Sequence, residues 1–220
     1  MSFLKSFIPT KVSNETILKF FELLRLTASH KFNGNLEKNK KNFNNHLEEI
    51  KKNDGYIENQ HLYTDMNYGN KTIDFCGCEI IATYNAIYDL TGKHDISFPN
   101  MIDSFEKDGI VLSGFFGTAP RSIEDYLKRQ GFKTNSSSKM DEYDKIGEKS
   151  DALILTMFND KNNIMKMVHT INITKKNGGF YVHNNGFNSH LTKYNSISDL
   201  LLRINNGNAK DIFLIGIMKK

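Results

Sequence analysis

The chain has 220 residues, of which 39% are hydrophobic and 25% are charged, and its formal net charge is +4 at pH 7. This length is enough to bury a core, and we expect one domain with an N-terminal extension. No stretch approaches the roughly 20 apolar residues that span a bilayer, which excludes a transmembrane protein. The first residues lack the long apolar run and cleavage site of a secretory signal, so we expect a cytoplasmic protein.

The distribution of charge and the two cysteines narrow the range of functions further. Lysines alternate with Asp and Glu and form no basic block, so nucleic acid is not expected as a partner. Cys76 and Cys78 are separated by one residue, and a disulfide between them would be strained. The seven histidines show no spacing typical of zinc ligands, and we expect neither a metal nor another cofactor.

The first part of the chain has helical patterns. Apolar residues at helical spacing predict a helix from Asn14 to about His30 and an amphipathic helix from Asn35 to Lys52. We therefore assign residues 1–53 to a helical extension and residues 54–220 to the main domain. The extension is expected to pack on the domain, with a cover over a cleft or a partner-binding arm as alternatives.

The middle of the chain centres on a helix that begins at a cysteine. Residues 67–77 have no helical period and are expected to form a loop. From Cys78 to Leu90 apolar residues share one helical face, and Gly92 is a candidate C-cap. After another loop, a helix is expected from Ser122 to Gln130, followed by a flexible connector at residues 136–138.

The last third of the chain changes its period from helical to alternating. Short apolar or alternating runs predict strands at Ala152–Phe158, Met167–Thr174, Gly179–Asn184 and Asp211–Met218, with a helix at Ile197–Ile204 before the last strand. Helices followed by an antiparallel sheet make an α+β arrangement.

Cys78 is the first candidate for chemistry, because a thiol in the first turn of a helix lies near the positive end of the helix dipole. This position favours the thiolate, and the free backbone N–H groups there can also stabilise an oxyanion. A cysteine at an apolar helix start is nevertheless more often a packing residue than a nucleophile. The functional interpretation therefore requires a base.

His169 is the best candidate for that base. If Lys176 pairs with Gly179, alternation along the two strands places His169 on the apolar face, and Asn184 lies diagonally across from it. The separation of roughly 7 Å can be bridged by side chains. Cysteine, histidine and asparagine then provide a nucleophile, a base and an orienting residue. His183, in contrast, is expected to be exposed.

These residues resemble a known family. The segments Gly77–Ala82, Gly117–Pro120, Val168–Ile171 and Tyr181–Asn184 are similar to papain-like cysteine peptidases, and most of all to the branch that cleaves after double-glycine leaders of bacteriocins. The likeness covers about residues 67–220, with Cys, His and Asn in the family's order. It implies the papain-like fold, with N-terminal helices followed by an antiparallel sheet.

The family pattern also bears on the choice of nucleophile and oxyanion donor. In the family a small residue follows the thiol by four positions, as Ala82 follows Cys78. Cys76 remains an alternative nucleophile, or a thiol that resolves an oxidised neighbour. The family's Gln shortly before the cysteine is missing here. Asn70, eight positions before Cys78, is the oxyanion donor that we expect, since Gln60 is distant in the sequence.

The resemblance implies a cysteine peptidase or hydrolase that cleaves a peptide or amide bond through a thioester. Cys78 would attack, His169 would transfer the proton, and Asn184 would orient His169. The same residues would serve an acyl transferase or a transglutaminase-like enzyme, and an inactive domain that binds a peptide or a partner is the remaining alternative. A peptide or protein substrate is the expected partner.

Overall fold

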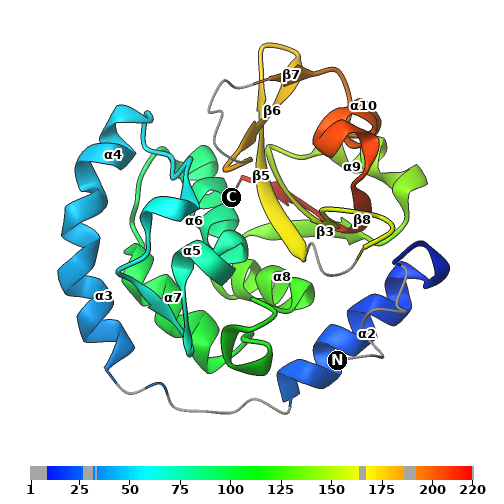
Figure 1. Ribbon diagram of the computed structural model, residues 1–220. Helices are drawn as coiled ribbons and strands as arrows, with labels where there is room; N and C mark the ends of the chain where they lie inside the picture. Colours follow the sequence, from blue (N-terminus) through cyan, green and yellow to red (C-terminus); the bar gives the residue numbers. More distant parts are fainter. Residues whose placement is uncertain (1–8, 27–31, 33, 164–166, 186–191, 220) are drawn as a thin grey trace.

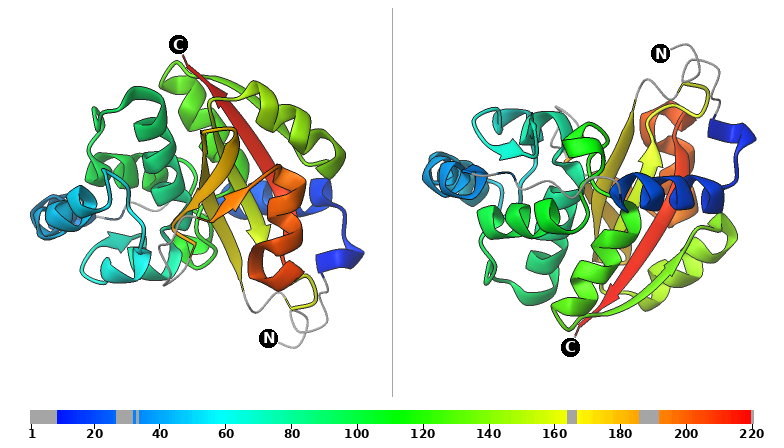
Figure 2. Two further views of the ribbon diagram at one scale, coloured as in Figure 1. Left: turned by 90° about the horizontal axis from the view of Figure 1, so that it is seen from above. Right: turned by 90° about the horizontal axis from the view of Figure 1, so that it is seen from below.

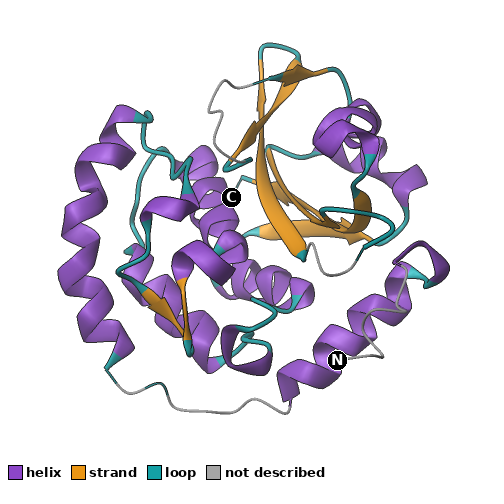
Figure 3. Cartoon of the chain, in the orientation of Figure 1, coloured by secondary structure: helices purple, strands orange, loops and turns teal. Residues whose placement is uncertain are grey.

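The computed structural model describes residues 9–26, 32, 34–163, 167–185 and 192–219. Most helices gather on one side and the main sheet lies on the other (Figures 1 and 3). The two sides meet along α6 (Cys78–Thr91), which packs against strands β4 (Ala152–Phe158) and β5 (Val168–Lys176). The predicted α+β class, with helices first and an antiparallel sheet second, is confirmed.

The remaining elements are short and follow one another closely. The helices are α2 (Asn14–Leu26), α3 (Asn35–Phe43), α4 (Leu47–Lys52), α5 (Ile73–Cys76), α7 (Phe98–Lys107), α8 (Pro120–Arg129), α9 (Tyr143–Lys149) and α10 (Ile197–Arg203). The strands are β1 (Asn67–Tyr68), β2 (Lys71–Thr72), β3 (Lys133–Ser137), β6 (Gly179–His183), β7 (Lys193–Tyr194) and β8 (Lys210–Met218).

The main sheet is antiparallel, with the strand order β3-β8-β4-β5-β6-β7. One face packs against α2, α6 and α8, and the other packs against α9 and α10, so helices cover both faces (Figure 2). Lys176 pairs with Gly179, which confirms the predicted register of the β5–β6 hairpin. Ile173 and Val182 are therefore opposite each other and lie in the core between the sheet and α9–α10.

The helix α6 forms where the sequence predicts it, and both of its ends agree with the prediction. It begins at Cys78 and ends before Gly92, whose φ of 66° is the left-handed conformation that glycine adopts without strain. A polar contact fixes it to the sheet. The carboxylate of Asp89 accepts hydrogen bonds from Thr174 at 2.8 Å and from Asn172 at 3.1 Å.

Residues 57–60 form hydrogen bonds both to α6 on the helical side and to Asn184 after the end of β6. The side chain of Asn85, fully buried in α6, exchanges two hydrogen bonds of 2.9 Å with the backbone N–H and C=O of Ile57. These two bonds satisfy both backbone polar groups of Ile57, and buried backbone groups need such partners. It also sets the position of the next three residues.

The N-terminal extension contacts both sides of the molecule. Figure 1 shows α2 beside the sheet, whereas α3 and α4 flank the helices. Leu18 from α2 and Ile50 from α4 are buried in the same apolar cluster as α6. The division of the chain into an extension, residues 1–53, and a main domain, residues 54–220, stays a prediction. Among the described residues, no helix combines the length and apolar character that a bilayer span requires.

Several predictions in the middle of the chain are wrong. Residues 67–77, expected as a loop, contain β1, β2 and α5, which are too short for their period to show. Residues 136–138, expected as a connector, include the end of the polar strand β3, which is specified by its pairing with β8. The helices α7 and α9 were not predicted, although α7 carries apolar residues at helical spacing.

Replacement of Asn85 by alanine leaves the N–H and C=O of Ile57 buried without partners. We expect the free energy of unfolding to fall by about 3 kcal/mol, since each orphaned group costs about 1–3 kcal/mol. Urea denaturation measures this loss, with Asn100→Ala at an exposed position of α7 as the control. Equal stability of the two variants would contradict the role assigned to Asn85.

Candidate active site

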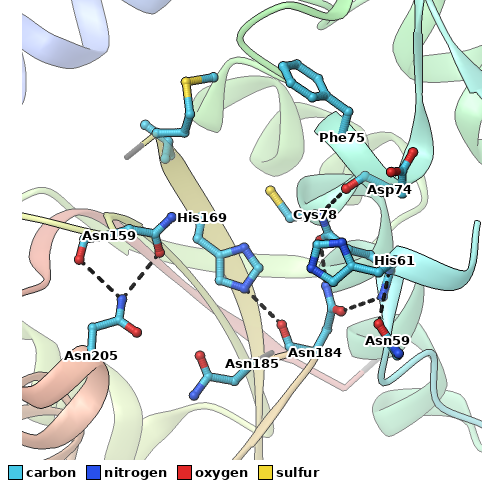
Figure 4. A pocket seen from close by; sticks show the side chains of 13 residues that line it. Asn59, His61, Asp74, Phe75, Cys78, Asn159, His169, Asn184, Asn185 and Asn205 are labelled. Atoms are coloured by element: carbon cyan, nitrogen blue, oxygen red, sulfur yellow. Dashed lines mark hydrogen bonds between the residues drawn. The ribbon is translucent and has the colours of Figure 1, made fainter. Parts of the chain in front are cut away.

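A cleft of about 440 Å³ lies where the first turn of α6 meets the start of β5 (Figure 4). Cys78 and His169 enter it from these two elements, and Asn184 follows the end of β6 beside them. The structure thus brings together three residues that the sequence proposed. The described residues that line the cleft are Asn59, Gln60, His61, Asp74, Phe75, Cys78, Asn159, Met167, Val168, His169, Asn184, Asn185 and Asn205.

The thiol of Cys78 is buried and protonated in this arrangement. Its Sγ donates a hydrogen bond to Oε2 of Glu79 at 3.3 Å, and the backbone N–H of Thr170 faces it. Burial raises the pKa of Cys78 well above its usual range, and the Glu79 carboxylate raises it further. Burial and the neighbouring carboxylate therefore oppose the thiolate that we expected at the helix terminus.

Glu79 is a buried acid directly beside the thiol, with an exposed fraction of 2%. Burial raises its pKa to about 7, although backbone N–H groups of Glu79 and Thr118 partly stabilise the charge. Gly117 makes room for this carboxyl group, since a Cβ there would lie 2.7 Å from both carboxylate oxygens. The charge beside Cys78 consequently changes near neutral pH.

His169 is held in one tautomer by a backbone group. Its Nε2 lies 2.8 Å from the carbonyl oxygen of Asn184, and because a carbonyl only accepts, Nε2 carries the hydrogen. In the neutral ring Nδ1 then has the free lone pair. Burial lowers the pKa of His169, and the nearby His61 lowers it further. In the described part of the chain, no hydrogen bond joins His169 to Sγ of Cys78.

Asn184 contacts His169 in a different way from the one predicted. Its side chain points to Gln60, accepting from the backbone N–H and donating to Oε1, both at 3.0 Å. Only its backbone carbonyl reaches the imidazole. The predicted pairing placed Asn184 near His169 correctly, but its φ of 57° ends the strand alternation and turns the carbonyl toward the ring.

Asn70 is not at the cleft, and this prediction is wrong. It is exposed in the turn between β1 and β2, where its N–H bonds to the carbonyl of Ser113. Gln60 lines the cleft instead, with its amide donating to the carbonyl of Asp74 at 2.9 Å. The sequence argument set Gln60 aside as distant from the cysteine, because the position of Gln60 depends on Asn184, far along the chain. The polar run Glu58–His61 was the feature of the sequence that could have indicated a cleft-lining segment.

The alternative nucleophile Cys76 lies outside the cleft lining. It ends α5, and its Sγ faces the carbonyls of Thr72 at 3.4 Å and Tyr68 at 3.9 Å. Burial, then the carboxylates of Glu79 and Asp74, raise the pKa of this thiol above its usual range. This placement favours Cys78 as the thiol that can meet a substrate.

His183 was expected at the surface, but only 2% of it is exposed. Its Nδ1 lies 2.5 Å from Oε1 of Glu58, and its Nε2 lies 2.6 Å from Oγ1 of Thr174. Alternation along β6 places it on the face opposite Val182, where α6 and the 57–60 segment cover the sheet. That cover is formed by residues distant in the sequence, so the hairpin pattern could not reveal it.

Glu79→Gln is expected to change how stability depends on pH. The folded state retains the Glu79 proton up to about pH 7, whereas the unfolded state releases it near 4.5. The folded state therefore binds more protons in this window, and stability falls as the pH rises. Between pH 4.5 and 8, wild type should lose about 3 kcal/mol more than Glu79→Gln, measured by denaturation at each pH. Parallel curves for the two proteins would refute the burial of an acidic Glu79.

Comparisons with known proteins give matches among solved structures. No protein-family model and no curated protein matches the chain. Among solved structures, the chain is similar to the peptidase domain of Streptococcus ComA, a bifunctional ABC transporter involved in a quorum-sensing pathway. The TM-score is 0.44 and the identity 13%, over 65% of this chain and 91% of that domain.

Proposed function

We propose that the protein is a cysteine hydrolase that cleaves a peptide or amide bond, with Cys78 as nucleophile and His169 as base. One observation carries this proposal. Cys78 at the start of α6 and His169 at the start of β5 line one open cleft, and the carbonyl of Asn184 holds Nε2 of His169. Nδ1 is therefore the atom that can accept the thiol proton.

The protonation states favour a resting pair without charge. The pKa of Cys78 is raised and that of His169 is lowered, so both groups are neutral near pH 7. The thiol leaves Glu79 when it turns toward a bound carbonyl group. Its proton then passes to His169 as Sγ forms the bond to carbon, which is general-base catalysis and does not need a preformed thiolate.

The reaction then follows two acyl-transfer steps. Attack of Sγ gives a tetrahedral oxyanion, which collapses to a thioester while His169 returns its proton to the leaving amine. A water molecule gives a proton to His169 and attacks the thioester, which releases the carboxylic acid and restores the Cys78 thiol. If an amine replaced this water, the same residues would transfer the acyl group.

Two groups are suited to stabilise the oxyanion. The backbone N–H of Cys78 lies in the first turn of α6, where N–H groups lack helical acceptors. The amide of Gln60 is the second proposed donor, because it lines the cleft and uses one of its two hydrogens on Asp74. Gln60 thus takes the place that the sequence argument gave to Asn70.

A binding domain without activity is the second candidate. The hydrogen bond from Sγ of Cys78 to Glu79 favours it, because this bond directs the thiol away from the base. Such a domain would bind peptides in the same cleft and would not depend on the thiol. Loss of Cys78 therefore separates the two candidates.

Cleavage of a mixture of unstructured peptides of known sequence, followed by mass spectrometry, tests the proposal. Cys78→Ala should abolish cleavage, and His169→Ala should slow it by at least about 10²-fold through loss of general-base catalysis. Cys76→Ala, which changes the other buried thiol, should keep activity. Peptide binding without cleavage, unchanged in Cys78→Ala, would establish the binding domain instead.

A further inference from the structure

A buried carboxylate is joined to the candidate base His169 through the backbone of Asn184. Glu58 has an exposed fraction of 9%, and its two oxygens bond to neighbouring residues of one strand end. Oε1 lies 2.5 Å from Nδ1 of His183, and Oε2 accepts the backbone N–H of Asn184 at 2.9 Å. The N–H that Glu58 holds and the carbonyl that holds His169 belong to the same residue, Asn184.

The position of Glu58 is fixed from both sides. Before it in the chain, Asn85 holds the backbone of Ile57 against α6. Across from it, His183 bonds through Nε2 to Thr174, and its ring stacks on Tyr56 at 3.9 Å between centroids. The carboxylate therefore has little freedom to move away from Asn184.

Asn184 needs such support because its backbone is unusual. A φ of 57° lies in the left-handed region, which is strained for a residue with a Cβ. Asparagine tolerates it better than most residues. Glu58 accepts the backbone N–H of Asn184 and Gln60 bonds to its side chain, and in this conformation the Asn184 carbonyl lies 2.8 Å from Nε2 of His169.

We propose that Glu58, held by His183, is the positioning residue of the reactive histidine and acts through the backbone of Asn184. The inference rests on the proposed function and deepens it. In this site the role of orienting His169, which the sequence argument gave to the side chain of Asn184, is shared by two other groups. The Asn184 carbonyl fixes the tautomer of His169, and the buried carboxylate of Glu58 fixes that carbonyl.

Alkylation of Cys78 by iodoacetamide at pH 7, located by mass spectrometry, measures His169 function without a known substrate. Glu58→Ala should slow it at least about tenfold, because small displacements of a catalytic group are costly. Glu58→Gln retains an acceptor for the Asn184 N–H and should lose less. Glu106→Ala removes another buried carboxylate, one bound to Asn35 and Gly69, and should lower stability without slowing alkylation.

The same measurement in a His169→Ala background separates positioning from a structural role. If Glu58 acts through His169, Glu58→Ala should have almost no further effect once His169 is gone. A loss of equal size in both backgrounds would overturn the inference. If His169→Ala slows alkylation but Glu58→Ala does not, only the inference fails. If His169→Ala itself has no effect, the proposed function fails with it.

Two variants of Asn184 test the backbone route in proteins that keep Glu58. Both Asn184→Gly and Asn184→Ala lose the side chain, but glycine adopts a φ of 57° without strain and keeps the carbonyl in place. The glycine variant should therefore alkylate faster than the alanine variant. An equal, large loss in both would show that the side chain orients His169 and would overturn the inference.

Discussion

The hydrogen bonds of the 57–60 segment are the constraint on which the cleft depends. Cys78 belongs to a helix and His169 to a sheet, and these elements could pack in more than one relative position. Asn85 fixes Ile57 to α6, while Glu58 and Gln60 fix the end of β6 through Asn184. Because Asn85 and Glu58 are buried and Gln60 is half-buried, an alternative position would leave some of these polar groups without partners. Each buried group without a partner costs about 1–3 kcal/mol. The relative position of thiol and imidazole is therefore set by polar satisfaction as much as by apolar packing.

Burial gives this cleft its chemical character. It raises the pKa of the thiol, lowers that of the imidazole and brings Glu79 to a pKa of about 7. All three effects favour neutral groups at rest, since a low-dielectric site penalises charge. On the proposed mechanism, a bound carbonyl group draws the thiol from Glu79 toward His169.

The sequence predicted those features that depend on local pattern. The limits of α6, its glycine cap and the β5–β6 register follow from periodicity and turn residues, and they placed Cys78, His169 and Asn184 near one another. The positions of Gln60, Glu58 and His183 depend on contacts between segments more than a hundred residues apart, which one sequence does not reveal. The backbone role of Asn184 was missed for another reason. Strand alternation describes side chains, whereas a left-handed residue at the strand end presents its carbonyl.

The pH dependence of Cys78 alkylation, compared between wild type and His169→Ala, tests most directly whether the two residues act as a pair. If Nδ1 of neutral His169 accepts the thiol proton, the wild-type rate should rise as His169 loses its proton, below pH 6.5, and then level off. His169→Ala should remove this plateau and leave only the rise at high pH that belongs to an unassisted buried thiol. Identical profiles for the two proteins would show that the thiol and the imidazole share a cleft without sharing a proton, and would contradict the account.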